Sequence, residues 1–357
     1  MIKLLHSADW HLDAPMSCHS QACSEHLHQE LARIPEKIVG LARANQCQLI
    51  LLSGDLFDGA YRTDTVRLVQ KQLGQAQIPV FIAPGNHDPL GPDSPYSMDG
   101  WPDNVHIFTE QAIRSVSLQE LDCKVYGAGY TAMDCPALMT DFRATGTERW
   151  HIGILHGEAD TANSNYCPIT RDQLRESALS YLALGHIHKG GSLRAGETVC
   201  AWPGCPMGKG FDETGAKGAI LVTLDDTISA VFCPLDAPRF YDEQVDVTGD
   251  PAQAMEAILP ALPSEDVYRI TLCGYSAPID TEALCRHFSH VPYLTVRDET
   301  VPETDLWRGV NDDSLEGVYF SLLQQAAMSD NPQLREKALL AARISRQILS
   351  GQEVKLP

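Results

Sequence analysis

The chain has 357 residues, and 44% of them are hydrophobic, which is typical of a folded globular protein and excludes a disordered chain. Its 27 Lys and Arg against 47 Asp and Glu leave a formal charge of −20. Such a charge argues against a protein that coats nucleic acid through bulk basicity, although it allows a local basic groove.

The location expected from the sequence is the cytoplasm, without membrane contact. No apolar run approaches the roughly 20 residues that a membrane-spanning helix needs, and the N-terminus shows no signal peptide. The 11 cysteines are an odd number and include no Cys-x-x-Cys pair. They are therefore interpreted as reduced thiols, most of them buried.

The first third of the chain predicts a β-α-β-α-β order, which favours parallel neighbouring strands with right-handed crossovers. Apolar runs predict the strands, and apolar residues three and four apart predict the helices. The strands are expected at 2–8, 48–53 and 79–84, and the helices at 24–45 and 63–74. Pro35 lies inside the first helix and is expected to bend or split it.

The next stretch predicts a second sheet after a long irregular loop over residues 89–104. The expected strands of this sheet are 105–108, 113–118 and 124–126, followed by a helix over 134–149, strands at 151–155 and 181–184, and a helix over 170–177. A hairpin of 219–224 with 228–232 is expected to close the core.

Three parts of the chain are predicted: a main domain over 1–235, a smaller α+β capping domain over 240–300 and a C-terminal helical segment over 311–357. Asp313 is the expected N-cap of the first terminal helix, with Glu316 placed for a capping box. The apolar stripe of that helix is expected to pack within its own domain. The second terminal helix, 332–349, is the most basic stretch and the better interface candidate.

Polar residues with metal-binding side chains follow five of the predicted strands. They are Asp9 and His11; Asp55 and Asp58; Asn86, His87 and Asp88; His156; and His186 and His188. A parallel or mixed sheet is expected to bring these strand ends to one edge. Such a set of polar residues is not expected in a hydrophobic core, because unpaired polar groups are costly to bury.

These ligands are of intermediate hardness and suit Mn²⁺, Fe or Zn²⁺, with Mn²⁺ the first expectation. They are too many for one tetrahedral ion but suit two ions roughly 3.5–4 Å apart that share a bridge. Asp55, on the central strand, is the expected bridge, and a hydroxide between the metals is the expected nucleophile. His87 is expected to be a general acid or transition-state stabiliser rather than a ligand, with Asp88 placed either to orient it or to raise its pKa. Asp58 is interpreted either as a carboxylate that orients a ligand or as a turn residue.

Taken together and in order, these residues resemble the motifs of the calcineurin-like metallophosphoesterases. They are Asp9-x-His11, Gly54-Asp55-x-x-Asp58, Gly85-Asn86-His87-Asp88, His156 and Gly185-His186-x-His188. The resemblance implies a four-layer α/β/β/α sandwich. It also implies two metal sites: one held by Asp9, His11, Asp55 and His188, the other by Asp55, Asn86, His156 and His186.

Within that superfamily the chain is most similar to the SbcD-type DNA repair exonucleases, particularly a YhaO-like branch. Residues 54–58, 101–108, 181–188 and 202–218 carry this similarity. It implies a 3′-to-5′ exonuclease on DNA ends that works with an SMC-like coiled-coil ATPase docked on the terminal helices. Archaeal and eukaryotic relatives place a His where this chain has Asp58, so the catalytic role of Asp58 is open.

Two other functions fit the same residues. A small-molecule phosphodiesterase or phosphatase is favoured by the charge of −20. A scaffold that kept the metal site without turnover is the non-enzymatic alternative, and the complete ligand set with His87 speaks against it. A homodimer is left open.

Overall fold

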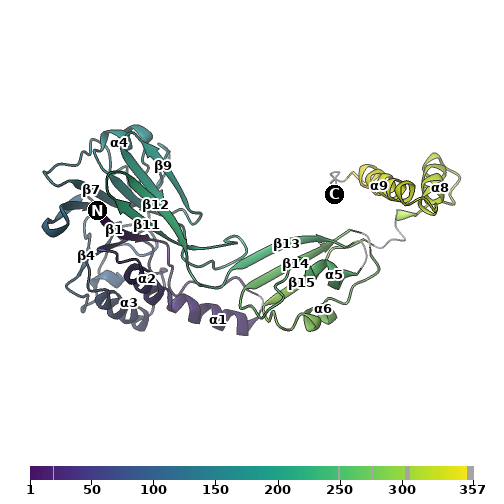
Figure 1. Cartoon of the computed structure of the whole chain (residues 1–357), viewed down its shortest axis with the longest axis horizontal. Coiled ribbons are helices and arrows are strands. Elements are labelled where there is room, and N and C mark those ends of the chain that lie inside the picture. The colour runs from purple at the N-terminus through teal and green to yellow at the C-terminus, as the bar shows by residue number, and fades with distance from the viewer. Residues whose placement is uncertain (19, 248–249, 275, 302–305, 352–357) are drawn as a thin grey trace. The chain divides into compact units, whose positions relative to one another are not determined.

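The computed structural model describes residues 1–18, 20–247, 250–274, 276–301 and 306–351. Its packing divides the chain into two units, Met1–Tyr241 and Asp242–Pro357 (Figure 1). All predicted metal ligands belong to the first unit. The finer division into 1–235, 240–300 and 311–357 stays a prediction.

The first sheet of the first unit has the strand order β12-β11-β1-β2-β3-β4. The strands are β1 (Ile2–Ser7), β2 (Leu49–Leu52), β3 (Val80–Ile82), β4 (Val105–Ile107), β11 (Gly218–Leu224) and β12 (Ile228–Pro234). β1 to β4 run parallel, as predicted for the first three. The predicted hairpin is confirmed as β11 and β12, and β11 pairs antiparallel with β1.

Helices α1 (Gln21–Ala32), α2 (Ile34–Ala44) and α3 (Thr63–Gln75) belong to the crossovers of this sheet. The single helix predicted over 24–45 is divided at Arg33, and Pro35 lies in the first turn of α2. Proline is tolerated there because the first-turn N–H groups have no partner within the helix. The expected split at Pro35 is thus confirmed.

The second sheet has the order β5-β6-β7-β8-β10-β9. Its strands are β5 (Arg114–Leu118), β6 (Cys123–Gly127), β7 (Trp150–His156), β8 (Tyr181–Gly185), β9 (Gly191–Ala195) and β10 (Thr198–Trp202). β6, β7, β8 and β10 run parallel, and the two edge strands are antiparallel to their neighbours.

Two predictions for this region are wrong. Residues 105–108 do not join the second sheet, because Val105 pairs with Val80 and makes β4 the edge of the first. Residues 134–149 form turns rather than a helix. The backbone of Cys135 bonds to Asn165 and Cys167 instead of continuing a helical ladder.

The main core lies between the two sheets. It combines alternate buried residues of both, such as Leu4 and Leu51 from the first sheet and Ile154 and Ala183 from the second. A second cluster covers the outer face of the second sheet, where α4 (Arg171–Glu176) packs beside irregular chain. In Figure 1 both sheets lie between α2 and α3 below and α4 above. This arrangement confirms the four-layer α/β/β/α fold.

The second unit contains a three-stranded sheet and four described helices. The sheet has the order β13-β14-β15, with β13 (Phe240–Asp246) beginning just before the unit boundary, β14 (Val267–Cys273) and β15 (Leu294–Asp298). The helices are α5 (Pro251–Glu256), α6 (Thr281–His287), α8 (Leu315–Ala327) and α9 (Pro332–Leu349). No helix in the described part of the chain is long and apolar enough to cross a membrane.

The start and the apolar face of α8 both differ from prediction. Ser314, not Asp313, is the N-cap, because its hydroxyl accepts a hydrogen bond from the Gly317 N–H at 3.0 Å. Phe320, which the predicted stripe did not include, is the large side chain of α8 that is fully buried, against Leu306 and Ala342. Leu315 and Leu322 are 89% and 61% exposed, so the expectation that the stripe packs within its own domain is wrong for these residues.

The inter-sheet core makes a direct stability prediction. We expect Leu51→Ala to destabilise the first unit by about 2–5 kcal/mol, because it removes a fully buried side chain and leaves a cavity between the sheets. Urea unfolding followed by circular dichroism measures the change. Val231→Ala, at a position 54% exposed, is the matched control and should change stability by less than about 0.5 kcal/mol. Equal effects of the two variants would contradict the assigned core.

Candidate metal centre

The loops that follow β1, β2 and β8 place their polar residues in unusual backbone conformations. Asp9, His11 and Asp55 have φ values of 55°, 47° and 52°, and His186 has 91°. Side chains other than glycine rarely adopt positive φ, and the cost must be met by surrounding contacts. Two such contacts join the loops: Asp9 N–H donates to Gly54 O at 3.0 Å and His11 N–H to Asp55 O at 2.9 Å.

Glycines at two positions make room for these side chains. At Gly54, with φ of 90°, a Cβ would lie 2.4 Å from His156 Nδ1, and at Gly85 a Cβ would lie 2.2 Å from Asp55 Oδ1. Neither neighbour can move without leaving the centre. Both positions therefore require glycine because the backbone approaches a functional side chain.

The strand ends come from two sheets rather than from one edge, which corrects the expectation from sequence. β1, β2 and β3 of the first sheet carry Asp9, His11, Asp55 and Asn86 in the loops that follow them. β7 ends at His156, and β8 precedes His186 and His188, in the second sheet. The centre thus lies where the carboxyl ends of two packed sheets meet, and it depends on the core between them.

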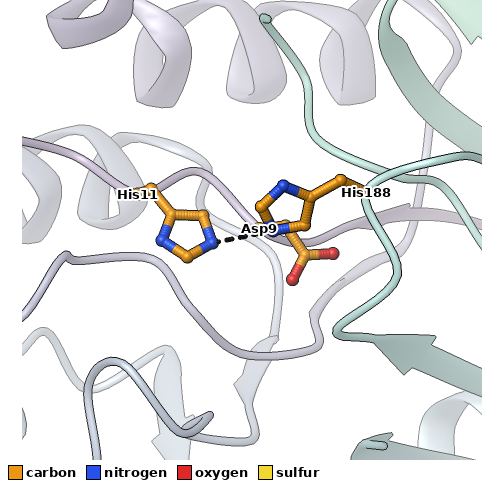
Figure 2. A group of neighbouring side chains, drawn as sticks. All are labelled: Asp9, His11 and His188. Carbon is orange, nitrogen blue, oxygen red and sulfur yellow. Dashed lines mark hydrogen bonds between the residues drawn. The ribbon is translucent and has the colours of Figure 1, made fainter. Parts of the chain in front are cut away.

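Asp9, His11 and His188 form the first cluster, and their nearest ligand atoms lie within 4.8 Å of one another. Figure 2 shows the three side chains turned toward one another. Asp9 Oδ1 accepts a hydrogen bond from the His186 N–H at 2.9 Å. Asp9 Oδ2 is buried and has no hydrogen-bond partner among the described residues. A buried, unpaired carboxylate oxygen is costly unless a cation contacts it.

The tautomers of His11 and His188 point to the same conclusion. His11 Nδ1 lies 3.3 Å from Asp58 Oδ1, and His188 Nδ1 contacts Glu213 Oε1. A carboxylate only accepts, so each Nδ1 donates, and a ring without a second proton presents a lone pair at Nε2. The two Nε2 atoms are 3.1 Å apart (Figure 2). Two lone pairs at that distance repel each other unless a cation lies beside them.

Asp55 lies between the first cluster and a second one. Its Oδ2 is 3.6 Å from His11 Nε2 and 3.2 Å from His156 Nε2, while its Oδ1 accepts from the His87 N–H at 2.9 Å. Asp9, Asp55 and His156 also bring their ligand atoms within 4.8 Å of one another. This is the position that a carboxylate shared by two ions requires.

Asn86 joins the two histidines of the second cluster. Its Oδ1 lies 2.9 Å from His156 Nε2 and 3.2 Å from His186 Nδ1, and its amide nitrogen donates to Met133 Sδ at 3.6 Å. The contact with the sulfur turns the carbonyl oxygen toward the histidines. Asn86 therefore offers that oxygen as a ligand.

The rings of His156 and His186 are held from behind. His156 Nδ1 donates to the Ser53 carbonyl at 2.9 Å, which leaves Nε2 to face Asp55. Burial lowers the pKa of His156, but the neighbouring Asp55 carboxylate outweighs it and raises the pKa to about 9. His186 stacks on Tyr166 with 4.4 Å between ring centres, and its Nε2 lies 3.2 Å from Glu158. Burial and the charge of His156 lower the pKa of His186.

Asp58 contacts two histidines and none of the other carboxylates of the centre. Its Oδ1 lies 2.9 Å from Nδ1 of the half-exposed His87 and 3.3 Å from Nδ1 of His11. The hydrogen bond with His11 lowers the pKa of Asp58, although burial opposes it. Its contact with His11 fits the interpretation of Asp58 as a carboxylate that orients a ligand.

The expectation that Asp88 orients His87 is wrong. The Asp88 carboxylate is buried and accepts hydrogen bonds from the N–H groups of Leu56, Phe57 and Gly85 at 2.7–3.1 Å and from Tyr96 Oη at 2.6 Å. Burial raises the pKa of Asp88. Asp88 therefore holds the loops after β2 and β3 together, and Asp58 takes the place expected for it beside His87.

Sequence reasoning missed two carboxylates, Glu213 and Glu158. Glu213 is buried, contacts His188 Nδ1, and accepts from the Lys209 N–H at 2.8 Å. Burial raises the pKa of Glu213, but the hydrogen bond with His188 and the charge of Lys209 outweigh burial, so the pKa lies well below its usual value. The only signal in the sequence was the glycine-rich stretch 208–218 around Glu213, which gave no ligand spacing.

The donor set fits the two ions implied by the resemblance. Asp9, His11, Asp55 and His188 would hold one, and Asp55, Asn86, His156 and His186 the other. In both sets acceptor atoms face each other in buried space, and no described donor pairs with Asp9 Oδ2. The carboxylates behind the histidines raise their strength as ligands and fix their tautomers.

A buried set of His, Asp and Asn ligands at the ends of two packed sheets defines a metal-dependent hydrolase of the phosphoesterase class. Residues 2–190 match the family described as calcineurin-like phosphoesterase. The match spans more than half of the chain, which therefore belongs to that family.

One relative is the uncharacterized metallophosphoesterase YhaO of Bacillus subtilis (strain 168). It is 35% identical over 242 residues, which cover 62% of this chain and 57% of the relative. The similarity thus spans little more than half of the relative's length.

Solved structures similar to the chain include a dimetal phosphatase from Danio rerio, with 13% identity, a TM-score of 0.43 and coverage of 64% of this chain and 95% of that one. The protein TT1561 of Thermus thermophilus has 12% identity, a TM-score of 0.40 and coverage of 65% and 98%. Likeness at this level carries no argument about the activity of this chain.

Glu213 supplies a test of how the first cluster is supported. We expect Glu213→Gln to weaken Mn²⁺ binding by about 10–100-fold, because the carboxylate that fixes the His188 tautomer is lost. Calorimetric titration of the metal-free protein measures the affinity. Glu197→Gln, at an exposed position, is the control and should bind as the wild type does. Unchanged binding in Glu213→Gln would show that His188 needs no support.

The pKa of His156 predicts how the metal-free protein responds to pH. Since this pKa rises from 6.5 to about 9 on folding, its stabilisation is complete below pH 6.5 and is lost as the pH rises through 9. At 1.36 kcal/mol per pKa unit, the loss is roughly 3 kcal/mol. Urea unfolding in chelator at both pH values measures it. His156→Gln should abolish this loss, and a wild type equally stable at both pH values would contradict the assignment.

Proposed function

We propose that the chain is a metal-dependent phosphodiesterase that removes nucleotides from DNA ends in the 3′-to-5′ direction. The single observation that carries this proposal is the half-exposed His87 beside a ligand set of which five members are buried. A buried centre with one accessible acid–base group suits hydrolysis of a phosphodiester whose leaving oxygen must be protonated.

His87 has the contacts that a general acid needs. Asp58 accepts from its Nδ1 at 2.9 Å, which leaves Nε2 to give a proton to the leaving oxygen. The Asp55 carboxylate, through its Oδ1, holds the His87 backbone N–H. His87 is thereby positioned by both carboxylates without occupying a ligand position.

The metal pair is proposed to be manganese, since carboxylate, amide and imidazole ligands of this kind suit it. When bound, two such ions neutralise phosphate charge and lower the pKa of water. The chain itself contributes seven ligands, five of them buried, the fixed tautomers of its histidines, and a proton donor at the exposed side.

The choice of DNA over other phosphodiesters rests on the motif similarity to the SbcD-type exonucleases at residues 54–58, 101–108, 181–188 and 202–218. A small-molecule phosphodiesterase or phosphatase is the second candidate. The charge of −20 favours it, because an acidic surface repels the DNA backbone beyond local contacts.

A coiled-coil ATPase of the SMC type is the proposed partner, docked on α8 and α9. Leu315, Val318 and Leu322 follow one another at helical spacing on α8 and are 55–89% exposed. Arg335 and Lys337 of α9 are exposed as well, whereas Arg346 turns inward to Glu316 and stacks on Phe320. An exposed apolar stripe beside basic residues suits a coiled coil with an acidic surface.

A nuclease assay tests the proposed activity. We expect Mn²⁺-dependent release of nucleotides from a linear duplex, with a 3′ label released first, and a fall of about 10²–10⁴-fold in His87→Ala, because the proton donor is lost. His287→Ala, exposed in the second unit, is the control. If the protein hydrolyses small diesters but never DNA, with or without an added ATPase, the second candidate holds. If the activity were unchanged in both His87→Ala and Asn86→Ala, the measured activity would not come from this centre, and the non-enzymatic scaffold would be the better hypothesis.

The partner surface has its own test. Leu322→Asp should abolish co-purification with the coiled-coil ATPase, since a charge replaces an apolar side chain that is 61% exposed. Gln333→Asp, exposed at the start of α9, is the charge-matched control and should still bind. Binding by both variants alike would remove α8 from the proposed interface.

A further inference from the structure

A cavity of about 460 Å³ adjoins the metal centre at His188. Strands β10, β11 and β12 and the loop after β8 form its walls. Ala201 and Ile220 line it and also belong to the core between the sheets, so it is the open end of that layer. Its volume lies within the range of small-ligand sites, which is about 300–1,000 Å³.

The charge of this cavity is opposite to that of the chain. Lys189 and Lys217 line it, whereas its described lining residues include no Asp or Glu, although acidic residues outnumber basic ones by 47 to 27 in the sequence. Neither lysine forms an ion pair with a residue in the described part of the chain. Two such ammonium groups in one cavity of an acidic protein attract an anion.

The cavity and the metal centre share the loop after β8. Lys189 directly follows the ligand His188 in that loop, and both residues line the cavity. One of the two positive charges of the cavity therefore lies one residue from a ligand of the metal centre.

The walls of the cavity also offer aromatic surface. Phe232 on β12 lines the cavity and is 44% exposed, whereas the half-buried Trp202 packs against the cluster on the outer face of the second sheet. An aromatic ring left open to solvent in a cavity is a surface on which a flat ring can stack. Lysines and aromatic rings together are the combination that binds a phosphate and its base.

We infer that this cavity, the nucleotide pocket, binds the nucleotide next to the phosphate at the metal centre, with its base against Phe232 and its outer phosphate on Lys189 and Lys217. The inference rests on the phosphodiesterase function proposed above and names its substrate class. The pocket would thus read the end of a nucleic acid strand, independently of bulk surface charge.

Binding of dAMP to the full-length protein tests the pocket. Quenching of tryptophan fluorescence gives the Kd, with deoxyadenosine and inorganic phosphate as separate probes. We expect Lys217→Glu and Phe232→Ala each to raise the Kd for dAMP by about tenfold or more. Phosphate alone should respond to Lys217→Glu only, and deoxyadenosine mainly to Phe232→Ala.

Two matched controls accompany these variants. Val231→Ala changes the neighbouring residue on β12, which points to the opposite face of the strand, and Lys71→Glu reverses an exposed charge on α3. Both should bind dAMP as the wild type does. Circular dichroism confirms that all four variants are folded.

The outcomes separate the pocket from the proposed function. If wild-type protein fails to bind dAMP, or if Lys217→Glu and Phe232→Ala bind it as well as the controls do, the pocket is wrong even where DNA is degraded. If dAMP binds through these residues but DNA is not degraded, the pocket stands and the exonuclease proposal fails in favour of a small nucleotide substrate.

Discussion

The structure depends on a set of lone-pair acceptors that are held together, out of water, where two sheets meet. Asp9 Oδ2 has no described partner, and His11 and His188 face each other through Nε2 at 3.1 Å. Asp55 Oδ2 lies 3.6 Å from the same His11 Nε2 and 3.2 Å from His156 Nε2. Acceptors this close repel one another unless protons or metal ions lie among them, and two bound metal ions would contact all of them at once. The inter-sheet core, the left-handed loop residues and the carboxylates behind the histidines hold the acceptors in place against their mutual repulsion.

That requirement explains why the loops carry conformations that a free chain avoids. Positive φ at Asp9, His11, Asp55 and His186 costs stability, and the cost is offset by contacts between loops rather than within them. Asp88 is the clearest case, since one buried carboxylate accepts four hydrogen bonds from three segments of chain. A residue that the sequence suggested for catalysis is thus one that keeps the catalytic loops in register.

The sequence predicted much of this centre because chemistry concentrates where strands end. The apolar runs before Asp9, Asp55, Asn86, His156 and His186 predicted strands, and each of them forms a strand that leads into the metal centre. The sequence did not show that the ligands come from two sheets, because strand pairing joins residues that are far apart in the chain. Val105, for example, pairs with Val80 only in the folded chain. Glu213 was missed for the same reason, since it reaches His188 from a loop without ligand spacing. The exposure of Leu315 and Leu322 could not be predicted either. An apolar stripe on a helix has the same sequence pattern whether the stripe is buried or exposed to solvent.

The most direct measurement of the central claim is anomalous scattering from a crystal of the protein loaded with Mn²⁺. The account predicts two peaks, one among Asp9, His11 and His188 and the other among Asn86, His156 and His186, with the Asp55 carboxylate in contact with both. A single peak, or two peaks of which Asp55 contacts neither, would contradict it.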